Sequence, residues 1–284
     1  MTTTGWRLAV RSFSQNRLAV AGLGIIVLLV LLCFAGPHLY VTDQTSVNPV
    51  DSLLPPGGGH PLGTDAQGFD VLGRIMLGGQ ASLQIGLLAA LLATAIGTLY
   101  GTIAGLAGGL VDGAMMRVVD VLLSIPFLFI VLIAATRFSS SVLSLSLILG
   151  AFSWLAPARL VRAEVLALRS RGFVSAATVM GATKLRIIVR HLIPNALGVV
   201  IVNITFQVAD AIIAVSLLGF LGFGLNYPAV EWGTQLSDGV GHLLEGSWWL
   251  IYPVGACLVL VVMAFNFVGD ALRDSVDVRL KGGR

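Results

Sequence analysis

Six long apolar runs, separated by polar or glycine-rich segments, constrain this chain more than any other feature of its sequence. A helix of about 20 apolar residues spans the hydrocarbon core of a bilayer. Inside a bilayer every backbone N–H and C=O group needs a partner within the protein, and a helix supplies these partners. Hydrophobic residues make up 56% of the chain and charged residues 11%, which is typical of membrane proteins. We therefore predict an all-α polytopic membrane protein with six transmembrane helices, at about residues 18–40, 81–106, 120–137, 142–158, 196–224 and 249–268.

The distribution of Lys and Arg predicts which helix ends face the cytoplasm. With both termini inside, 15 of the 17 Lys and Arg residues lie on the cytoplasmic side, and only Arg74 and Arg137 lie outside. Cytoplasmic loops of membrane proteins carry such an excess of basic residues. The net charge of +3 therefore reflects anchoring to the membrane and its lipid, and no nucleic acid partner is inferred. The predicted parts are a cytoplasmic segment 1–17, a six-helix domain 18–272 with external loops 41–79 and 225–247 and a cytoplasmic loop 159–195, and a cytoplasmic tail 273–284.

Two local patterns predict how the second and third spans are built. Gly97, Gly101 and Gly105 recur at every fourth residue, so they form a strip against which a neighbouring helix can pack closely. In the third span, Arg117 and Asp120 are three residues apart and can pair along one helix face, and Pro126 is expected to kink the helix.

Three polar residues interrupt the fifth span. Asn203, Gln207 and Asp210 are spaced at i, i+4 and i+7, which places them on one face of a helix. Polar and ionisable residues within a membrane rarely face lipid. Two interpretations stay open: the three residues line a translocation path, or they form hydrogen bonds to a neighbouring helix.

The segment 173–195 is polar and basic and lies between two apolar spans. Small residues, Ser175, Ala176 and Ala177, would allow the walls of another protein to approach the backbone closely. Gly181 can adopt the left-handed conformation that ends one short helix before a second begins near Thr183. The basic residues of the second helix are Lys184, Arg186 and Arg190. This pattern is typical of an element that inserts into a partner protein.

The spacing of small-Ala-Ala, three residues, Gly, nine residues and His-Leu-Ile-Pro-Asn resembles the EAA loop of ABC-importer permeases. In that family the loop carries a coupling helix that docks in a cleft of a cytoplasmic ATPase subunit. The resemblance implies this coupling role for Ser175, Ala176, Ala177 and Gly181, together with the basic residues of the same loop. Ser175 stands where the family pattern has Glu. The alternative is a loop without a partner, which is basic only because it faces the cytoplasm.

The external loops carry a second resemblance. The HPLGTD sequence of residues 60–65 resembles a segment of the C-type permease subunit of dipeptide, oligopeptide and nickel importers, although Phe69 replaces the usual Arg. LGFLGFG, at residues 218–224, resembles the SFLGLG segment of the same family, with Val215 in place of a frequent Glu. One His and one carboxylate, His60 and Asp65, do not make a metal site, so no metal or other cofactor is predicted. The candidate contacts with a substrate-binding protein are His60, Asp65, Phe69, Asp70, Glu231 and Trp232.

These resemblances imply a permease half of an ATP-driven ABC importer with the type I permease fold, in the bacterial cytoplasmic membrane. No phosphate-binding loop of the G-x-x-x-x-G-K-[ST] form is present, so the chain is not expected to be an enzyme. The implied partners are a second homologous permease subunit, two cytoplasmic ATPase subunits and an extracytoplasmic substrate-binding protein. Di- or oligopeptides are the expected cargo, with nickel chelates, glutathione or haem as alternatives. An enzyme embedded in the membrane and a channel that works without ATP are the competing functions.

Overall fold

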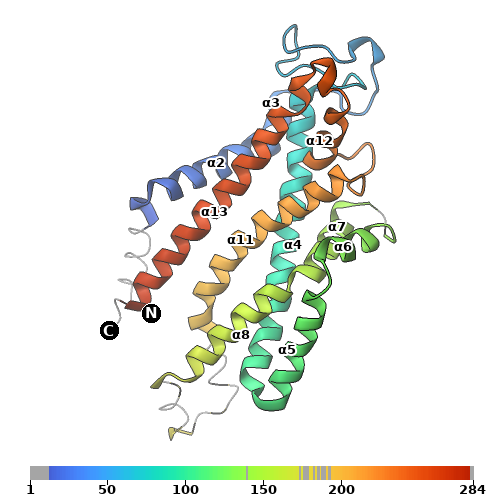
Figure 1. Ribbon diagram of the computed structural model, residues 1–284. Coiled ribbons are helices and arrows are strands. Elements are labelled where there is room, and N and C mark those ends of the chain that lie inside the picture. The colour runs from blue at the N-terminus through green and yellow to red at the C-terminus, as the bar shows by residue number, and fades with distance from the viewer. Residues whose placement is uncertain are drawn as a thin grey trace.

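In the computed structural model the described residues are 13–138, 140–172, 174, 179–181, 183, 186, 190 and 193–281. They form an elongated bundle of helices without a strand, as Figure 1 shows. The candidate coupling residues Ser175, Ala176, Ala177 and Lys184 lie outside the described residues. The α-helices are α2 (Arg17–Phe34), α3 (Gly36–Leu39), α4 (Val71–Ala107), α5 (Gly109–Leu123), α6 (Phe127–Ala135), α7 (Val142–Ser153), α8 (Leu155–Arg169), α11 (Ile193–Phe220), α12 (Trp232–Val240) and α13 (Tyr252–Lys281). Three 3₁₀ turns, η1 (Pro49–Asp51), η3 (Leu243–Glu245) and η4 (Trp248–Leu250), complete them.

The described helices provide four membrane spans, or up to six if each of two bent helix pairs is one span. Four helices are long and apolar enough to cross a membrane by themselves, and the pairs α5–α6 and α7–α8 each pass the same test as a bent span. The bend is 75° in the first pair and 45° in the second. The first bend lies at Ser124–Pro126, and the backbone N–H of Ser124 closes α5 there. The expected kink at Pro126 is therefore a complete break, because Pro126 precedes the first residue of α6.

Several segments predicted as loops are partly helical, because polar residues continue or begin helices. In the predicted external loop 41–79, α4 starts at Val71. In the predicted cytoplasmic loop 159–195, α8 continues to Arg169 and includes Arg159 and Arg162. The predicted loop 225–247 contains α12, and α13 continues to Lys281 through much of the predicted tail.

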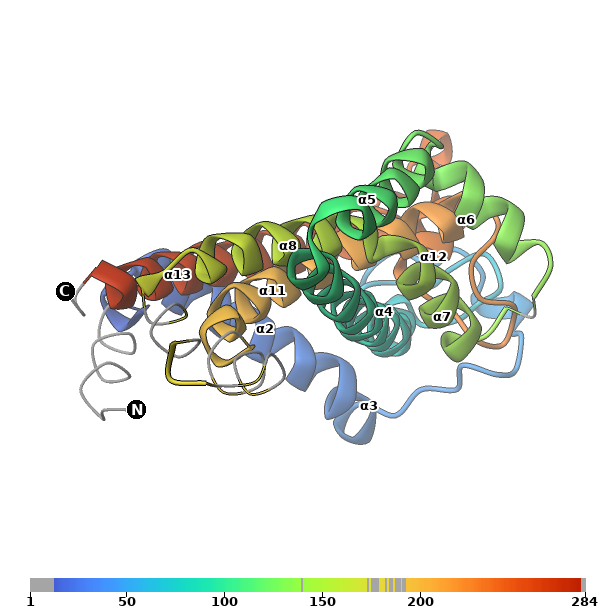
Figure 2. The same cartoon turned by 90° about the horizontal axis from the view of Figure 1, so that it is seen from below.

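α4 lies at the centre of the bundle and packs against α8, α7 and α11, as the view from below in Figure 2 shows. The predicted glycine strip is confirmed as its contact with α8. A Cβ atom at Gly97 would lie 2.5 Å from Cβ of Pro157, and one at Gly101 would lie 2.3 Å from the carbonyl oxygen of Ala158. The absence of a side chain at these positions lets the two backbones meet.

The predicted pair of Arg117 and Asp120 was wrong. Asp120 instead accepts a hydrogen bond from Nη2 of Arg159, which joins α5 to α8.

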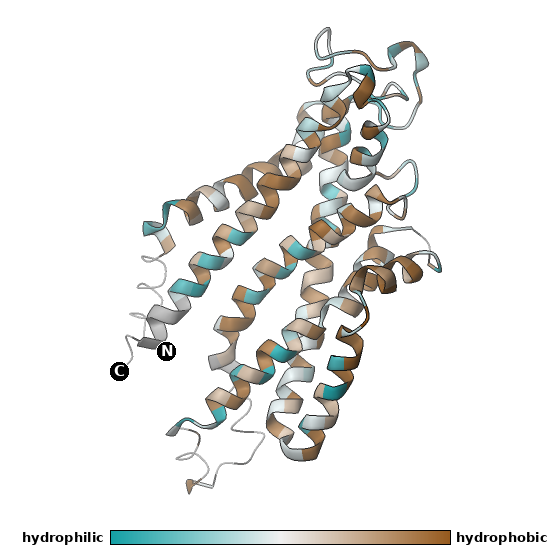
Figure 3. Cartoon of the chain, in the orientation of Figure 1, coloured by the Kyte–Doolittle hydropathy of each residue, from teal (hydrophilic) through white to brown (hydrophobic). Residues whose placement is uncertain are grey.

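The surface of the long helices is apolar, as expected for a chain in contact with lipid. Figure 3 shows mostly hydrophobic colour along α2, α6 and the half of α13 nearer the cap end, with hydrophilic bands on α5, α8 and the other half of α13. Leu28 of α2 is 62% exposed and Ile133 of α6 is 65% exposed. The largest buried cluster lies where α2, α4, α11, α12 and α13 meet, around Ile75, Ile212 and Trp232.

Candidate functional site

A cap of polar loops, residues 40–70 and 221–251, covers one end of α4 (Figure 1). Hydrogen bonds close it from within. Nε1 of Trp232 donates to the carbonyl of Ile75 at 3.0 Å, and Nε1 of Trp249 donates to the carbonyl of Thr64 at 3.1 Å. The cap is therefore joined by hydrogen bonds to the helix bundle and packs as part of it.

Asp70 joins the start of α4 to the preceding loop. Its Oδ1 accepts a hydrogen bond from the N–H of Gly73 at 2.8 Å and so caps the helix. Its Oδ2 accepts from the hydroxyl of Tyr40 at 2.8 Å and lies 2.9 Å from Nδ1 of His60. Burial and the hydrogen bond to Asp70 raise the pKa of Tyr40 to about 12. His60 and Asp70 thus act together as a structural clasp.

Asp65, Phe69 and Arg74 form a second set of contacts. Oδ1 of Asp65 accepts hydrogen bonds from the N–H groups of Gln67 and Phe69, both at 2.9 Å. The guanidinium of Arg74 lies over the ring of Phe69, 4.1 Å from its centroid, and its Nε is 3.5 Å from Oδ2 of Asp65. The substitution of Phe for the Arg of the family pattern is therefore accommodated by a cation–π contact with a different arginine.

Glu231 is a fully buried carboxylate at the start of α12. Its Oε2 accepts from the N–H of Gly233 at 2.5 Å, and its Oε1 accepts from the N–H of Thr234 at 2.8 Å and from the Thr234 hydroxyl. Gly219 and Gly224 leave the space that it occupies, because a Cβ atom at either would lie within 2.3 Å of Oε1. Burial raises the pKa of Glu231, although these hydrogen bonds oppose the shift. The glycines of LGFLGFG thus enclose an acid.

Four of the six residues predicted to contact a binding protein are buried in the structure. The exposed fractions are 1% for Phe69, 3% for Asp70 and 0% for both Glu231 and Trp232. These side chains build the interior of the cap and present no surface to a partner. Only His60 and Asp65 stay partly exposed, with side-chain exposures of 28% and 19%.

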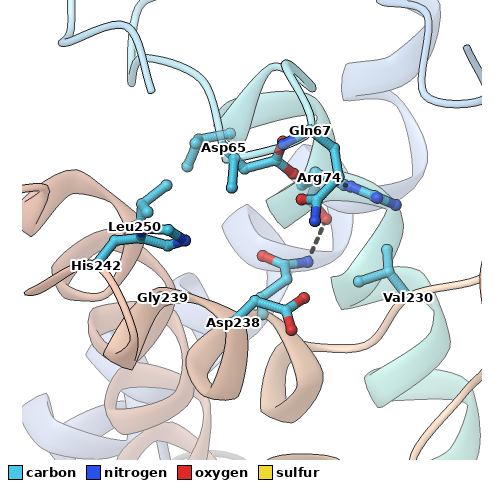
Figure 4. A pocket seen from close by; sticks show the side chains of 11 residues that line it. Asp65, Gln67, Arg74, Val230, Asp238, Gly239, His242 and Leu250 are labelled. Carbon is cyan, nitrogen blue, oxygen red and sulfur yellow. Dashed lines mark hydrogen bonds and ion pairs between the residues drawn. The ribbon is translucent and has the colours of Figure 1, made fainter. Parts of the chain in front are cut away.

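A small pocket of about 140 Å³ opens between the two halves of the cap (Figure 4). Asp65, Gln67 and Arg74 form one side and Asp238 and His242 the other. Nε2 of Gln235 donates to the carbonyl of Arg74 at 2.6 Å across it. Burial raises the pKa of Asp238, and the charge of Arg74 opposes the shift. Sequence reasoning overlooked Arg74, Gln235 and Asp238, although Arg74 is one of only two basic residues predicted to lie outside.

The three polar residues of α11 have different environments. Gln207 is buried, and its Nε2 donates to the carbonyl of Ser153 at 3.1 Å, so it ties α11 to the end of α7. Asn203 lines a cavity of about 350 Å³ with Glu164 and Arg273. Asp210 lines an apolar cavity of about 260 Å³ with residues of α6, α7 and α11. Of the three residues on this face, Gln207 forms a hydrogen bond between two helices, and Asn203 and Asp210 line cavities.

Part of the candidate coupling loop can be described. Gly181 has a φ of +79°, which confirms the predicted left-handed turn, and none of the described residues has an atom within 4 Å of a Cβ placed there. The N–H of Arg186 donates to Oγ1 of Thr183 at 3.4 Å, a contact of the kind that starts a helix. Arg186 and Arg190 are exposed.

Comparison with known proteins identifies the family. The family model described as "Binding-protein-dependent transport system inner membrane component" matches residues 97–282, and that of the "N-terminal TM domain of oligopeptide transport permease C" matches residues 4–56. The oligopeptide transport system permease protein OppC of Escherichia coli (strain K12) is 43% identical over 274 residues, which cover 96% of this chain and 90% of that protein. The dipeptide transport system permease protein DppC of Bacillus subtilis (strain 168) is 36% identical, over 95% of this chain and 85% of that protein.

A solved structure supports the fold. A chain of the MetNI methionine ABC transporter, in an inward-facing conformation, matches with a TM-score of 0.56 and 19% identity. The match covers 71% of this chain and 96% of that chain. Permeases of this kind work with ATPase subunits, which hydrolyse the ATP, and with substrate-binding proteins. The chain therefore belongs to the inner membrane components of binding-protein-dependent transport systems, and it is a multi-pass permease subunit of an ABC importer with the type I fold, not an enzyme.

Proposed function

We propose that this permease imports oligopeptides. The observation that carries the proposal is the 43% identity to an oligopeptide permease over nearly the whole length of both chains. The dipeptide permease at 36% identity extends the proposed cargo to shorter peptides. No contact in the described chain favours nickel chelates, glutathione or haem.

Uptake of a labelled tripeptide tests the proposal. The permease is produced with its partner subunits in cells that lack their own peptide importers. Peptide uptake that requires both this chain and ATP is the expected result. Uptake of nickel, haem or glutathione without peptide uptake would overturn it.

We further propose that the complex contains one homologous permease, two ATPase subunits and one binding protein. The cap would face outward and both termini would face the cytoplasm. In support, the start of α2, the ends of α8 and α13 and the start of α11 all lie at the end of the bundle away from the cap (Figure 1). The proposed parts are the segment 1–17, the six-helix domain 18–272 and the tail 273–284.

The proposed coupling site is the loop that follows α8. The exposed Gly181 turn supports it, because an exposed turn that packs against none of the described residues can meet another protein. Ser175, Ala176, Ala177 and Lys184 would complete this surface with Arg186 and Arg190. Nucleotide-driven closure of the ATPase subunits would move α8 through this loop.

The proposed translocation path runs along α11 past Asn203 and Asp210. Both residues open onto cavities, whereas Gln207 is assigned to helix packing by its bond to Ser153. For the binding protein we propose contacts with the partly exposed His60 and Asp65 at the rim of the cap. The buried Phe69, Asp70, Glu231 and Trp232 would act only by holding the cap in shape.

A further inference from the structure

α5 and α8 are joined by two ion pairs. Nε of Arg162 donates to Oδ1 of Asp112 at 2.5 Å, and Nη2 of Arg162 donates to Oδ2 at 2.7 Å. This two-point contact fixes the orientation of both side chains, and it is the stronger form of an ion pair. The second pair, Arg159 and Asp120, is about half exposed on both sides, with side-chain exposures of 50% and 48%. The Asp112 side chain, by contrast, is only 11% exposed.

Little else attaches α5 to the bundle. Asp112 and Val119 are the only buried residues of this 15-residue helix. Most of its other apolar side chains are exposed, with Leu110 at 93%, whereas Met115, Met116 and Leu122 are partly buried. The hydroxyl of Tyr100 on α4 also donates to the carbonyl of Met115 at 2.9 Å. The position of α5 relative to α8 therefore depends on charges rather than on apolar packing.

α8, in contrast, is packed firmly against α4. A Cβ atom at Gly101 would lie 2.9 Å from the backbone nitrogen of Arg162, and one at Gly105 would lie 3.2 Å from its carbonyl oxygen. The backbone of Arg162 thus rests on the glycine strip while its guanidinium reaches α5. This single residue of α8 therefore contacts both α4 and α5.

The two helices lead to different functional regions. α8 ends at Arg169, directly before the loop with the Gly181 turn. α5 continues through the 75° bend into α6, whose Phe127, Leu128 and Val131 line the cavity of Asp210. Arg162 and Asp112 lie on the route that joins these two regions.

We propose that Arg162 and Asp112 form a transmission clamp, a positioning pair that makes α5 follow α8 during the transport cycle. When the ATPase subunits move the loop after α8, the clamp carries the movement to α5 and, through the bend, to α6 at the Asp210 cavity. Breaking a partly buried ion pair leaves a poorly solvated charge without a partner, so we expect the pair to stay closed while both helices move. Without the clamp, α8 moves and α5 is left behind. The role rests on the proposed coupling site in the loop after α8 and does not depend on the cargo.

Arg162→Gln tests the clamp in the complete complex reconstituted in liposomes with its binding protein. ATP hydrolysis and substrate uptake are measured on the same preparation. Transport per ATP hydrolysed is expected to fall by about tenfold, within the range of coupling between distant sites, while hydrolysis stimulated by the binding protein continues. Asp112→Asn, which keeps the shape of the side chain, is expected to have the same effect. Arg169→Gln is the matched control, because Arg169 also lies on α8, but its guanidinium donates to the carbonyl of Leu106 on α4 at 3.4 Å and forms no ion pair with α5 in the part of the chain that the structure describes.

A second measurement separates transmission from simple support of the fold. Spin labels at the exposed positions Val118 on α5 and Leu160 on α8 report the distance between the helices in a cysteine-free background. We expect nucleotide to leave this distance unchanged in the parent complex and to change it in Arg162→Gln. The reversed pair, Asp112→Arg with Arg162→Asp, should restore both the constant distance and much of the transport per ATP. An unchanged ratio of transport to hydrolysis in Arg162→Gln and Asp112→Asn would overturn the proposal. Failure of both variants to assemble, with no rescue by the reversed pair, would also overturn it, because the pair would then only support the fold.

Discussion

Glu231 illustrates how a buried charge can be a structural element. The carboxylate loses its hydration on burial, which raises its pKa, yet it gains two backbone N–H donors and one hydroxyl donor at the start of α12. The loss of a helix N-cap costs about 1 kcal/mol, and an unsatisfied buried group costs more. Gly219 and Gly224 are needed because the acid fills the space that side chains would take.

The first prediction follows from this packing. In Gly219→Ala the new Cβ would lie 1.8 Å from Oε1 of Glu231, so the cap must distort, at a cost of about 1–3 kcal/mol. Glu231→Ala should also destabilise the complex, because α12 loses its N-cap. The double variant should lose at least about 0.5 kcal/mol less stability than the sum of the losses in the two single variants, since the clash is absent without the carboxylate. Melting temperatures of the purified complex measure the three effects, and simple additivity would show that the two residues do not compete for this space.

Asp210 carries the second prediction. No hydrogen bond or ion pair joins it to another part of the chain that the structure describes, and its cavity has otherwise apolar walls. Asp210→Asn keeps the shape and removes the charge. If the charge belongs to the path, uptake should change by about tenfold, which corresponds to about 1.4 kcal/mol, while assembly stays normal.

Asp210→Leu provides the complementary variant. If Asp210 only joins helices, Asp210→Asn should be nearly silent and Asp210→Leu should reduce the yield of assembled complex. Normal uptake of every tested peptide by Asp210→Asn would exclude a role for the charge in the path.

At the scale of the helices, the contact between α4 and α8 depends on the absence of side chains. In Gly101→Ala the new methyl group would lie 2.3 Å from the carbonyl oxygen of Ala158, which is backbone and cannot rotate away. We expect Gly101→Ala to lower the free energy of unfolding by about 1–3 kcal/mol, although Ala is a better helix former than Gly by about 1 kcal/mol. Gly113→Ala in α5 is the matched control, because no atom lies within 4 Å of its Cβ, and it should leave the melting temperature unchanged or raise it. Equal effects of the two substitutions would contradict this account of the helix contact.

The turn at Gly181 is the element on which the proposed coupling depends. A φ of +79° is strained for any residue with a Cβ, and most of all for a β-branched one. Gly181→Val should therefore distort the turn and reduce uptake by about tenfold or more, while membrane insertion and assembly persist because no described residue packs against this position. Gly172→Val, which has equally open surroundings without a positive φ, is the control. Normal uptake by an assembled Gly181→Val complex would exclude the coupling role of this turn.

For the molecule as a whole, the sequence predicted the class, the number of spans and the family, because apolar length and motif spacing are local properties. The glycine strip, the turn at Gly181 and a bend at Pro126 could also be predicted from the sequence, since each depends on the backbone chemistry of one residue type. The start of α4 could not be predicted from the sequence. Its first turns contain Gly73, Gly78 and Gly79, which look like a loop until their neighbours are known: Gly79 faces Cys33 and Trp232, and Gly78 faces Gln235.

The burial of the residues inside the cap could not be predicted from the sequence either. Asp70, Glu231 and Trp232 stand in polar segments, where side chains are usually exposed, so contact with a partner was the natural interpretation. Their burial results from pairing between segments far apart in the chain, such as the bond from Nε1 of Trp232 to the carbonyl of Ile75. The partner of Asp120 was missed for the same reason, because Arg159 is 39 residues away.

The orientation of the whole molecule in the membrane is the last prediction. Gln67 is exposed at the rim of the cap, and Thr183 is exposed beside the Gly181 turn at the proposed coupling surface. In a background without Cys33 and Cys257, Gln67→Cys should react with an impermeant thiol reagent in intact cells. Thr183→Cys should react only after the membrane is opened, because basic residues surround it and the cytoplasm is the side on which such residues gather. Labelling of both variants in membranes opened by detergent shows that each thiol is accessible. Reaction of Thr183→Cys but not Gln67→Cys in intact cells would reverse the proposed orientation and would place the Gly181 turn on the side where no ATPase subunit can reach it.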